Sequence, residues 1–298
     1  MKYLMFAITL LSGTLLTTSS FASDIPTSSS PANGPSYSQM YCSGFVTRRS
    51  IPHTNFVLGS KESPHEDRFP GRSLLFLGGP SLVEGQRYSL LRQVDDPNRE
   101  DSSPKQRKKL SELGALYQEV GWVTVRSVEK GASIASFDFA CDTAILGDIV
   151  VPYVEKAAVA FRSTDGPIKS FVAKRGSVSG QIVGSKDFVV LLGTGQIVYT
   201  DFGSAKGAKP GDYLFVLHGY SPSDLNKVDR ASARLPKGSE PSAVSQTEFG
   251  EKNVMRSVPE RVLGEILILS VTPEASTGMI TRSFSEMQLG DNVEPERP

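Results

Sequence analysis

Histidine and carboxylate side chains gather in one polar stretch of the chain, residues 51–72. His53 and His65 lie in this stretch. The acidic residues beside them are Glu62, Glu66 and Asp67. Imidazole and carboxylate groups can bind a metal ion or exchange protons with a substrate. Their spacing fits neither one face of a helix nor one face of a strand, which favours a solvated loop. We expect no metal ligands here and keep His53 and His65 as weak binding candidates.

Two aspartates occur at matching points of a repeated sequence, Leu-Gly-Asp. Asp148 follows Gly147, and Asp291 follows Gly290. A pair of carboxylates can perform glycoside hydrolysis, so the recurrence could indicate catalysis. A turn explains it better, because glycine accepts positive φ and a short aspartate side chain can hydrogen-bond the backbone of its own turn. We predict two equivalent structural corners and no catalysis by these aspartates.

The other motifs of catalysis and cofactor binding are incomplete. His218 closes a predicted strand, where a surface or half-buried histidine is typical. Residues 176–180 have Val178 at the position of a serine nucleophile. Residues 193–195, Gly-Thr-Gly, lack the third glycine of a dinucleotide site and favour a hairpin turn. The sequence therefore predicts no enzyme active site and no cofactor.

Charge and stacking offer two further binding candidates. A basic run contains Lys105, Arg107, Lys108 and Lys109. It could meet an anionic polymer, but nearby glutamates favour a solvated helix face. Trp122 corresponds to Glu265 in the repeat described next, which predicts an outward-facing ring. The chain has 32 basic and 32 acidic residues, so no net field favours nucleic acid as a partner.

An internal repeat must position these residues. Residues 121–152 and 264–295 align without a gap at an offset of 143 and share ten identities over 32 positions. Apolar residues alternate along each copy, which predicts a hairpin with one core face. Leu146 and Leu289 are expected to anchor the Leu-Gly-Asp corners to the core. The chain is therefore interpreted as a duplication.

Further alternating runs precede each copy of the repeat. The expected strands are 42–49, 73–77 and 86–93 in the first unit, and 179–183, 188–192, 197–200 and 211–218 in the second. Residues 179–183 are interpreted as the counterpart of residues 43–46. About six short strands per unit are typical of a small barrel. The sequence predicts an all-β fold of two tandem, duplicated, barrel-like modules.

Connecting segments complete the domain plan. Ser103 and Pro104 open a predicted helix, the one short helix of the first module. The apolar stripe of this helix is Leu110, Leu113, Leu116 and Tyr117. The expected boundaries are a disordered tether at 23–41, a first module at 42–152, a linker at 153–176, and a second module at 177–298 with a mobile insert at 220–257.

The first 22 residues have the parts of a secretory leader. Lys2 precedes an apolar run, and small residues up to Ala22 suit cleavage. The run is too short and too interrupted to span a bilayer, so we expect a secreted or periplasmic protein without a transmembrane segment in its mature chain. An oxidising compartment favours a disulfide between the two cysteines, Cys42 and Cys141.

Four short motifs carry a resemblance to known proteins. They are CSGF at residues 42–45, G-x-x-Y at 85–88, ACD at 140–142 and LGD-x-V at 146–150. Together they are similar to a group of uncharacterised secreted bacterial proteins, some of which carry peptidoglycan-binding LysM modules. The half-module from G-x-x-Y to LGD-x-V also resembles the C-terminal β-domain of flagellar assembly protein T. The resemblance covers roughly residues 42–296 and implies a β fold and an exported location.

These observations favour a non-catalytic binding or scaffolding protein of the bacterial cell envelope. The expected partner is an envelope protein or a cell-wall glycan, with no nucleic acid. One alternative is an envelope hydrolase or transferase with its site in the 51–72 loop. A second alternative, which rests on the resemblance alone, is an accessory factor of a surface appendage assembly.

Overall fold

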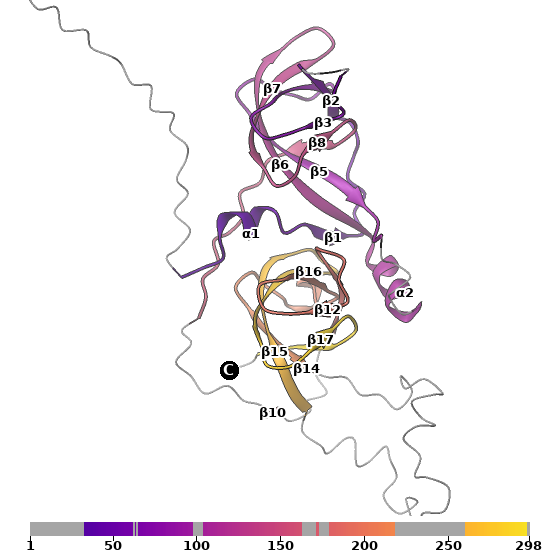
Figure 1. The fold of residues 1–298 in the computed structure, drawn as a ribbon, viewed down its shortest axis with the longest axis vertical. Helices are drawn as coiled ribbons and strands as arrows, with labels where there is room; N and C mark the ends of the chain where they lie inside the picture. The colour runs from indigo at the N-terminus through magenta and orange to yellow at the C-terminus, as the bar shows by residue number, and fades with distance from the viewer. Residues whose placement is uncertain are drawn as a thin grey trace, which may run out of the picture.

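Two small β-barrels follow each other along the chain (Figure 1). The computed structural model describes residues 33–61, 63, 65–97, 104–162, 171–172, 179–217 and 260–296. Strands dominate these residues, and the α-helices among them are α1 (Tyr37–Tyr41) and α2 (Pro104–Leu113). The predicted all-β fold of two tandem barrels is confirmed. The expected leader, the insert at 220–257 and His218 lie outside the described residues.

Each barrel is a ring of strands that closes on itself. Barrel 1 has the order β1-β6-β5-β9-β2-β4-β7, and β7 pairs back onto β6. Barrel 2 has the order β10-β15-β14-β18-β11-β13-β16, and β16 pairs back onto β15. The first strand in each order, β1 or β10, therefore lies outside the ring and extends one edge of it.

The strand bounds show how short most of these elements are. The strands of barrel 1 are β1 (Phe45–Thr47), β2 (Phe56–Ser60), β4 (Leu74–Gly78), β5 (Arg87–Val94), β6 (Ala115–Val128), β7 (Ser133–Ala140) and β9 (Ile149–Pro152). Those of barrel 2 are β10 (Phe171–Val172), β11 (Gly180–Ser185), β13 (Ile197–Thr200), β14 (Tyr213–Leu217), β15 (Glu260–Val271), β16 (Ser276–Ser283) and β18 (Asn292–Pro295). Two short ladders pair β3 (Arg68–Phe69) with β8 (Ala144–Ile145), and β12 (Leu191–Leu192) with β17 (Met287–Gln288).

The strand registers reproduce the sequence repeat. Trp122 pairs with Phe139 in the β6–β7 hairpin, and Glu265 pairs with Arg282 in β15–β16. Both hairpins have register shifts directly after these pairs and again at equivalent points further along. Equivalent residues differ by 143 throughout, as the alignment predicts. The duplication is therefore one of three-dimensional structure as well as of sequence.

The Leu-Gly-Asp corners form as expected in their backbone. Gly147 and Gly290 have φ angles of 83° and 96°, which glycine adopts without strain. Asp148 accepts a hydrogen bond from the backbone N–H of Ile145 at 2.8 Å, and Asp291 accepts one from Gln288 at 2.8 Å. Both aspartates are buried.

The leucines of the two corners behave differently. Leu289 is buried in the core of barrel 2, where Val189 and Val190 also pack. Leu146 is 54% exposed, so its predicted role as a core anchor is wrong. The difference follows from the chain beside the corner: in barrel 2 the backbone of Val190 bonds Leu289 directly. The same residue type at equivalent positions of the repeat is therefore buried in one barrel and exposed in the other.

The polar stretch 51–72 is not one loop, contrary to expectation. It contains β2 and β3, and β2 closes the ring between β9 and β4. In barrel 2 the equivalent position belongs to β11, which lies between β18 and β13. The predicted match of residues 179–183 with 43–46 is therefore wrong, because β11 corresponds to β2. Gly59, with φ of 156°, sits at a register shift in β2 and disturbs the alternation that would reveal a strand.

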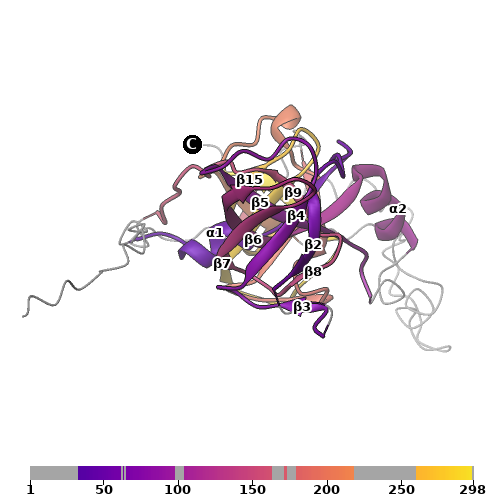
Figure 2. The same ribbon diagram turned by 90° about the horizontal axis from the view of Figure 1, so that it is seen from above.

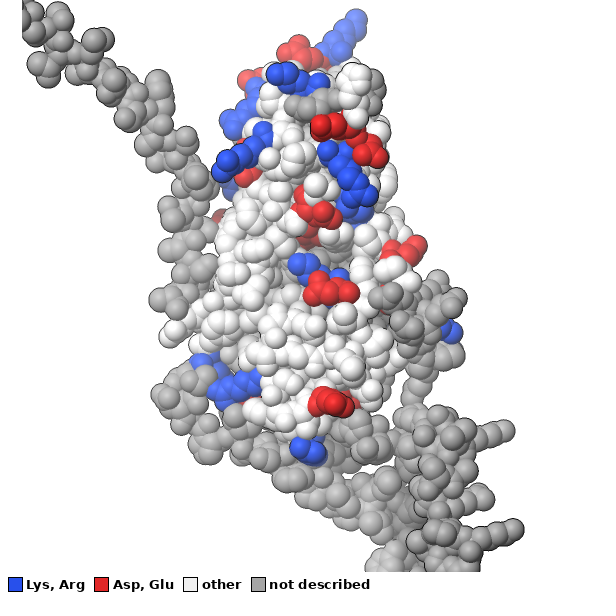
Figure 3. Space-filling view, in the orientation of Figure 1, with Lys and Arg blue, Asp and Glu red and all other residues white. Residues whose placement is uncertain are grey.

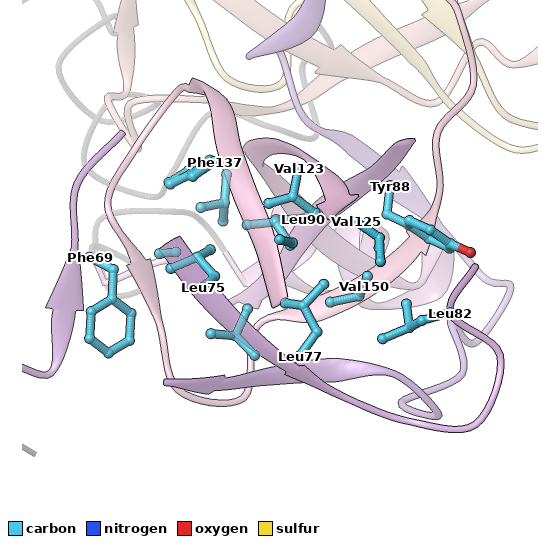
Figure 4. Packing of buried hydrophobic residues seen from close by; sticks show 14 residues of the cluster. Phe69, Leu75, Leu77, Leu82, Tyr88, Leu90, Val123, Val125, Phe137 and Val150 are labelled. Atoms are coloured by element: carbon cyan, nitrogen blue, oxygen red, sulfur yellow. The ribbon is translucent and has the colours of Figure 1, made fainter. Parts of the chain in front are cut away.

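Apolar side chains that point inward fill each barrel. Figure 4 shows the cluster of barrel 1, in which Leu75, Leu90 and Phe137 are fully buried. In barrel 2 the same inward positions of the hairpin carry Ile266 and Ile280. Each barrel has its own closed core, so the relation between the barrels depends on what lies outside those cores.

The segment 40–47, called the bridging segment below, lies between the two barrels (Figure 1). Tyr37–Tyr41 forms helix α1 with a capping box at Ser36, so the expected tether gives way to ordered structure before residue 41. The cause is packing: Met40 is buried against barrel 2 residues such as Leu269 and Met279. Cys42 follows directly and is joined to Cys141 of barrel 1, which confirms the predicted disulfide.

Hydroxyl groups of barrel 2 bind the backbone of the bridging segment. Tyr199 donates to the carbonyl of Ser43, Thr277 to that of Gly44 and Thr272 to that of Val46, each at 2.9 Å. Gly44 has a φ of 68°, and a Cβ atom there would lie 2.8 Å from the Tyr199 hydroxyl. Glycine is therefore required where the segment passes between the barrels.

Helix α2 adds a second contact between the barrels. It begins at Pro104 as predicted, but it ends at Leu113, and Gly114 with φ of 111° redirects the chain into β6. The predicted stripe is therefore wrong beyond Leu113, since Leu116 and Tyr117 belong to β6. The buried residues around this contact are Val46, Leu113, Leu116, Val183, Tyr199 and Ala275. The apolar face of α2 thus packs against barrel 2.

Two other strand expectations need correction. Of the strand expected at 188–192, β12 comprises Leu191–Leu192 alone. The linker expected at 153–176 contains β10, which pairs with β15 and so belongs to barrel 2. Short ladders of this kind have too few residues to show a periodic pattern.

Removing the disulfide should destabilise the protein. The Cys42–Cys141 bond spans 99 residues, and closing so long a loop restricts the unfolded chain. Replacing both cysteines with serine should lower the free energy of unfolding by about 2–4 kcal/mol, measured by urea denaturation. A reductant should lower the wild-type midpoint to that of the variant and leave the variant unchanged. Equal stability of the two proteins would contradict the structural role of the bond.

Candidate binding site

The outer surface of barrel 1 carries a cluster of aromatic rings around Trp122. The indole stacks on Phe139 with ring centroids 4.1 Å apart. Tyr37 and Tyr41 of α1 meet it edge-on at 5.4 and 5.5 Å, and Tyr153 does so at 5.5 Å. Trp122 faces away from the barrel core, as predicted, but it is only 6% exposed because α1 and the linker cover it.

An exposed cation extends this aromatic cluster to the surface. The Arg87 guanidinium lies 5.0 Å from the Tyr153 ring centroid and 5.9 Å from that of Trp122. Such cation–π contacts hold a long, mobile side chain in a defined place. Arg87 is the second unspecified position of the G-x-x-Y motif at residues 85–88, so the sequence motif drew attention to Gly85 and Tyr88 and not to the arginine.

A cleft of about 300 Å³ opens beside Arg87 and Tyr153. One wall carries the polar side chains of Asn55, Ser81 and Gln86, and the rest of the lining includes the apolar residues Pro52, Val150, Val151 and Pro152. The Asn55 amide is buried and donates to the Ser81 hydroxyl at 2.9 Å, which fixes one wall. The size falls at the lower end of the range for small-ligand sites. An aromatic and cationic rim beside a polar wall suits a hydroxyl-rich ligand.

Burial changes the acidity of the tyrosines in the cluster. Removal of Tyr41 from water raises its pKa to about 12, because the ionised form loses hydration. Burial also raises the pKa of Tyr37 and of Tyr153. All three phenols are therefore neutral near pH 7 and available as hydrogen-bond donors or acceptors.

Barrel 2 presents a larger cleft beside Glu265, with a lining that differs from that of the barrel 1 cleft. Glu265, the counterpart of Trp122, is 2% exposed and pairs with Arg162 of the linker. Arg162 also pairs with Glu296 and lies 4.4 Å from the Tyr213 ring centroid. A cleft of about 530 Å³ lies beside this ion pair, and its lining includes Arg162, Tyr213, Glu265 and Arg282. The equivalent outer positions of the two barrels, Trp122 and Glu265, thus both contact the linker. Trp122 does so through aromatic contact with Tyr153, and Glu265 through its ion pair with Arg162.

A second, half-buried ion pair ties the linker to barrel 1. Lys156 contacts Glu119 at 2.6 Å and also donates to the backbone carbonyl of Met40 at 2.8 Å. Glu119 in turn accepts a hydrogen bond from the backbone N–H of Gly44 at 3.1 Å. This network joins the linker, barrel 1 and the bridging segment. Lys156 and Glu119 therefore have structural partners.

The repeated aspartates are occupied structurally. Asp148 forms a two-point ion pair with Arg92, with both contacts at 2.8 Å. Arg92 also donates to the carbonyl of Thr143 at 2.8 Å, and the bond to Asp148 raises the pKa of the guanidinium. Asp148 and Asp291 each serve the corner of their own barrel. No common cleft among those of the described residues is lined by both.

The histidine cluster expected from the sequence does not assemble into a metal site. His53 precedes β2 and His65 follows it, and both side chains are exposed. Across the described part of the chain, no group of three or more His, Cys, Asp or Glu side chains is placed to hold a metal ion. The two histidines, which are close in sequence, lie on either side of strand β2.

One residue of the basic run, Lys109, contributes to the contact between the barrels. Lys109 of α2 pairs with Asp201 of barrel 2 at 2.7 Å and donates to the Gln181 side chain at 2.9 Å. Lys108 is exposed and pairs with Glu112 one turn along the helix at 3.9 Å. Lys105 lies in the first turn of α2. Arg107 lines a cleft of about 150 Å³ between α2 and the adjoining ends of β5 and β6, which Val183 of barrel 2 also lines. The run is therefore not one uniform anion-binding surface.

Charges of both signs are interspersed on the face of the molecule that Figure 3 shows. Figure 3 shows acidic and basic side chains interspersed on the face in view, without a broad region of either sign. This distribution agrees with the zero formal net charge of the sequence. A long polyanion would find no continuous positive track on this face.

Comparison with known proteins adds no relative. Neither a model of a protein family nor a curated protein matches the sequence. The helices that the structure describes are all too short or too polar to cross a membrane. Function is therefore argued from geometry.

Breaking the Arg92–Asp148 ion pair should lower the free energy of unfolding far more than breaking an exposed ion pair. Asp148 is 1% exposed at its side chain, so Arg92→Ala leaves a buried carboxylate without its cation. We expect a loss of about 3 kcal/mol in the free energy of unfolding, measured by urea denaturation.

Arg126→Ala is the matched control for that change. Its partner Asp138 and its own side chain are 31% and 59% exposed, so we expect a loss below about 1 kcal/mol. Similar losses in the two variants would contradict the assignment of Arg92 as a structural cation of the corner.

Ionisation of Tyr41 should weaken the fold at high pH. Its pKa rises from an ordinary 10.0 to about 12 on folding, so an unfolded chain releases this proton first as pH increases. Stability from this group is complete below about pH 10 and declines up to about pH 12. The difference in tyrosinate absorbance between wild type and Tyr41→Phe should titrate near 12; a difference centred on 10 would contradict the buried phenol.

Proposed function

We propose that the protein is an exported, non-catalytic binding and scaffolding component of the bacterial cell envelope, and that barrel 1 binds a cell-wall glycan. The observation that supports this most directly is the cleft beside Arg87 and Tyr153, with a polar wall and an aromatic rim. Sugars offer both hydroxyl groups and apolar ring faces, which match these two surfaces. The disulfide supports the exported location, because such bonds persist in oxidising compartments.

A fixed scaffold is the second part of the proposal. The bridging segment, α2 and the linker all join the two barrels through buried contacts and ion pairs. The clefts of barrel 1 and barrel 2 are therefore held in a constant relation to each other. Such an arrangement suits a protein that positions partners and does not transform them.

The hydrolase alternative gains no support from the described geometry. Its expected residues, His53 and His65, lie on either side of β2 and are exposed. The repeated aspartates are engaged in their own corners. No contact observed here favours the appendage alternative over the envelope scaffold.

Cosedimentation with insoluble peptidoglycan tests the proposal. Wild-type protein should pellet with the glycan in a saturable manner. Arg87→Ala and Tyr153→Ala should each weaken binding by about tenfold, because each removes one half of the cation–π rim. Far-UV circular dichroism checks that each variant keeps the fold.

Arg126→Ala provides the matched control, since it removes an exposed arginine from the outer surface of the same barrel. It should bind as the wild type does. Absence of wild-type binding, or equal binding by the Arg87 and Arg126 variants, would overturn the glycan assignment.

A further inference from the structure

The cleft of barrel 1 has one charged residue in its lining, Arg87. The other residues that line it are of uncharged types. The larger cleft of barrel 2 differs, because its lining holds a carboxylate, that of Glu265, together with two arginines. The barrel 1 cleft therefore presents a positive charge that no carboxylate of its own lining offsets.

Arg87 also lacks an acidic partner among the described residues. No carboxylate oxygen of these residues lies within 4.0 Å of its guanidinium. Glu155, which follows Tyr153 by two positions, is exposed and forms no such pair. Two other arginines of barrel 1, Arg92 and Arg126, each pair with an aspartate. Arg87 is thus a cation whose usual partner is not supplied by the described chain.

Aromatic rings hold this guanidinium in place without neutralising its charge. It sits over Tyr153, whose backbone N–H donates to the carbonyl of Arg87 at 3.1 Å. The phenols of Tyr37, Tyr41 and Tyr153 are neutral near pH 7, because burial raises the pKa of each. A guanidinium has planar N–H groups that can donate to both oxygens of one carboxylate. Arg87 is therefore positioned in advance for an anionic group.

The walls of the cleft are fixed by hydrogen bonds. The buried Tyr88 hydroxyl accepts from the backbone N–H of Val83 at 3.0 Å and donates to the carbonyl of Ser81 at 3.2 Å. The carbonyl of Asn55 accepts from the backbone N–H of Val150 at 2.9 Å. In the view of Figure 2, β5, β9 and β2 follow one another around barrel 1, as their pairing requires. A ligand therefore meets a preformed cleft, which lowers the entropic cost of binding.

The neutral part of the lining suits a sugar ring. The side chains of Asn55, Ser81 and Gln86 offer hydrogen bonds to hydroxyl groups, and Val150 and Pro152 offer an apolar surface to the ring face. Arg87 then adds one cation at the edge of this surface. The lining as a whole matches a sugar unit with an acidic group beside it.

We propose that the cell-wall glycan bound by barrel 1 is acidic, and that Arg87 pairs with a carboxylate carried by the sugar or by the peptide attached to it. This inference rests on the proposed glycan binding and adds the chemical group that is recognised. The formal net charge of the chain is zero, so general attraction to a polyanion is small. The dependence of binding on ligand charge should therefore come from Arg87.

Amidation of the carboxylates of insoluble peptidoglycan tests the proposal, by cosedimentation with the mature protein. Amidation neutralises the acidic groups and leaves the sugar rings unchanged. Wild-type binding should weaken by about fivefold, the upper range for a solvent-accessible ion pair. Arg87→Ala should bind the native and the amidated glycan equally, because its cation is already lost. Arg87→Lys keeps the charge, so amidation should still weaken its binding.

Arg126→Ala is again the matched control, since it removes an exposed arginine of barrel 1 that already has an acidic partner. Amidation should weaken its binding as much as that of the wild type. Arg87 is exposed, so its variants should keep the fold, which far-UV circular dichroism checks.

Competition identifies the carrier of the carboxylate. Cleavage of the amide bond between sugar and peptide releases soluble glycan strands, which have a carboxylate on the sugar, and free peptides. Displacement of the wild type from insoluble peptidoglycan by the strands assigns the carboxylate to the sugar. Displacement by the peptides assigns it to the peptide. Each fits the proposal if Arg87→Ala abolishes the dependence on amidation.

Two results would contradict the acidic ligand and leave glycan binding intact. One is saturable wild-type binding that amidation does not change. The other is equal weakening of the wild type and Arg87→Ala by amidation, which would place the recognised carboxylate away from Arg87. A wild-type protein that binds neither form of the glycan would refute the proposed function together with this inference.

Discussion

The covalent bond between Cys42 and Cys141 holds the bridging segment against barrel 1, and the arrangement of the two barrels depends on that constraint. A free N-terminal segment would lose much conformational entropy on ordering between two surfaces. Because the bond fixes its position on barrel 1, Met40 and the backbone around Gly44 are presented to barrel 2 in place. One bond therefore organises an interface between domains as well as closing a loop.

The duplication supplied two copies of the same barrel, and later differences gave them separate tasks. At the outer hairpin position, Trp122 in one copy and Glu265 in the other both receive the linker. On the other face, Tyr199 and Thr277 bind the bridging segment, where barrel 1 keeps Phe76 and Ile134. The inward positions stayed apolar in both copies because each barrel must close its own core. Divergence is thus concentrated on surfaces that meet another part of the chain.

Local patterns predicted much of this structure. The constant offset of 143, the alternating hairpins and the glycine corners were readable because they depend on residues close in sequence. The disulfide followed from the compartment and from the presence of two cysteines alone. Strand β2 escaped prediction because Gly59 and a register shift interrupt its alternation. As a result, the polar stretch with His53 and His65 was misread as one loop.

The candidate site was beyond reach of the sequence for a different reason. Arg87, Trp122 and Tyr153 are separated by tens of residues and come together only when the linker folds back over the barrel. Trp122 was correctly placed on the outside of the sheet from its counterpart Glu265. Its burial depended on α1, which the composition of the N-terminal segment did not predict. When one segment packs over the outward face of a sheet, neither the segment nor the sheet shows this contact as a periodic pattern in its sequence.

The central claim is that the disulfide-held bridging segment makes the two barrels one rigid body. Pulsed electron paramagnetic resonance can measure the distance between spin labels on non-natural residues at Lys130 of barrel 1 and Lys209 of barrel 2, both exposed. With the Cys42–Cys141 bond intact, one narrow distance distribution is expected, and reduction should broaden it. A broad distribution in the oxidised protein, or the same narrow one after reduction, would contradict the account.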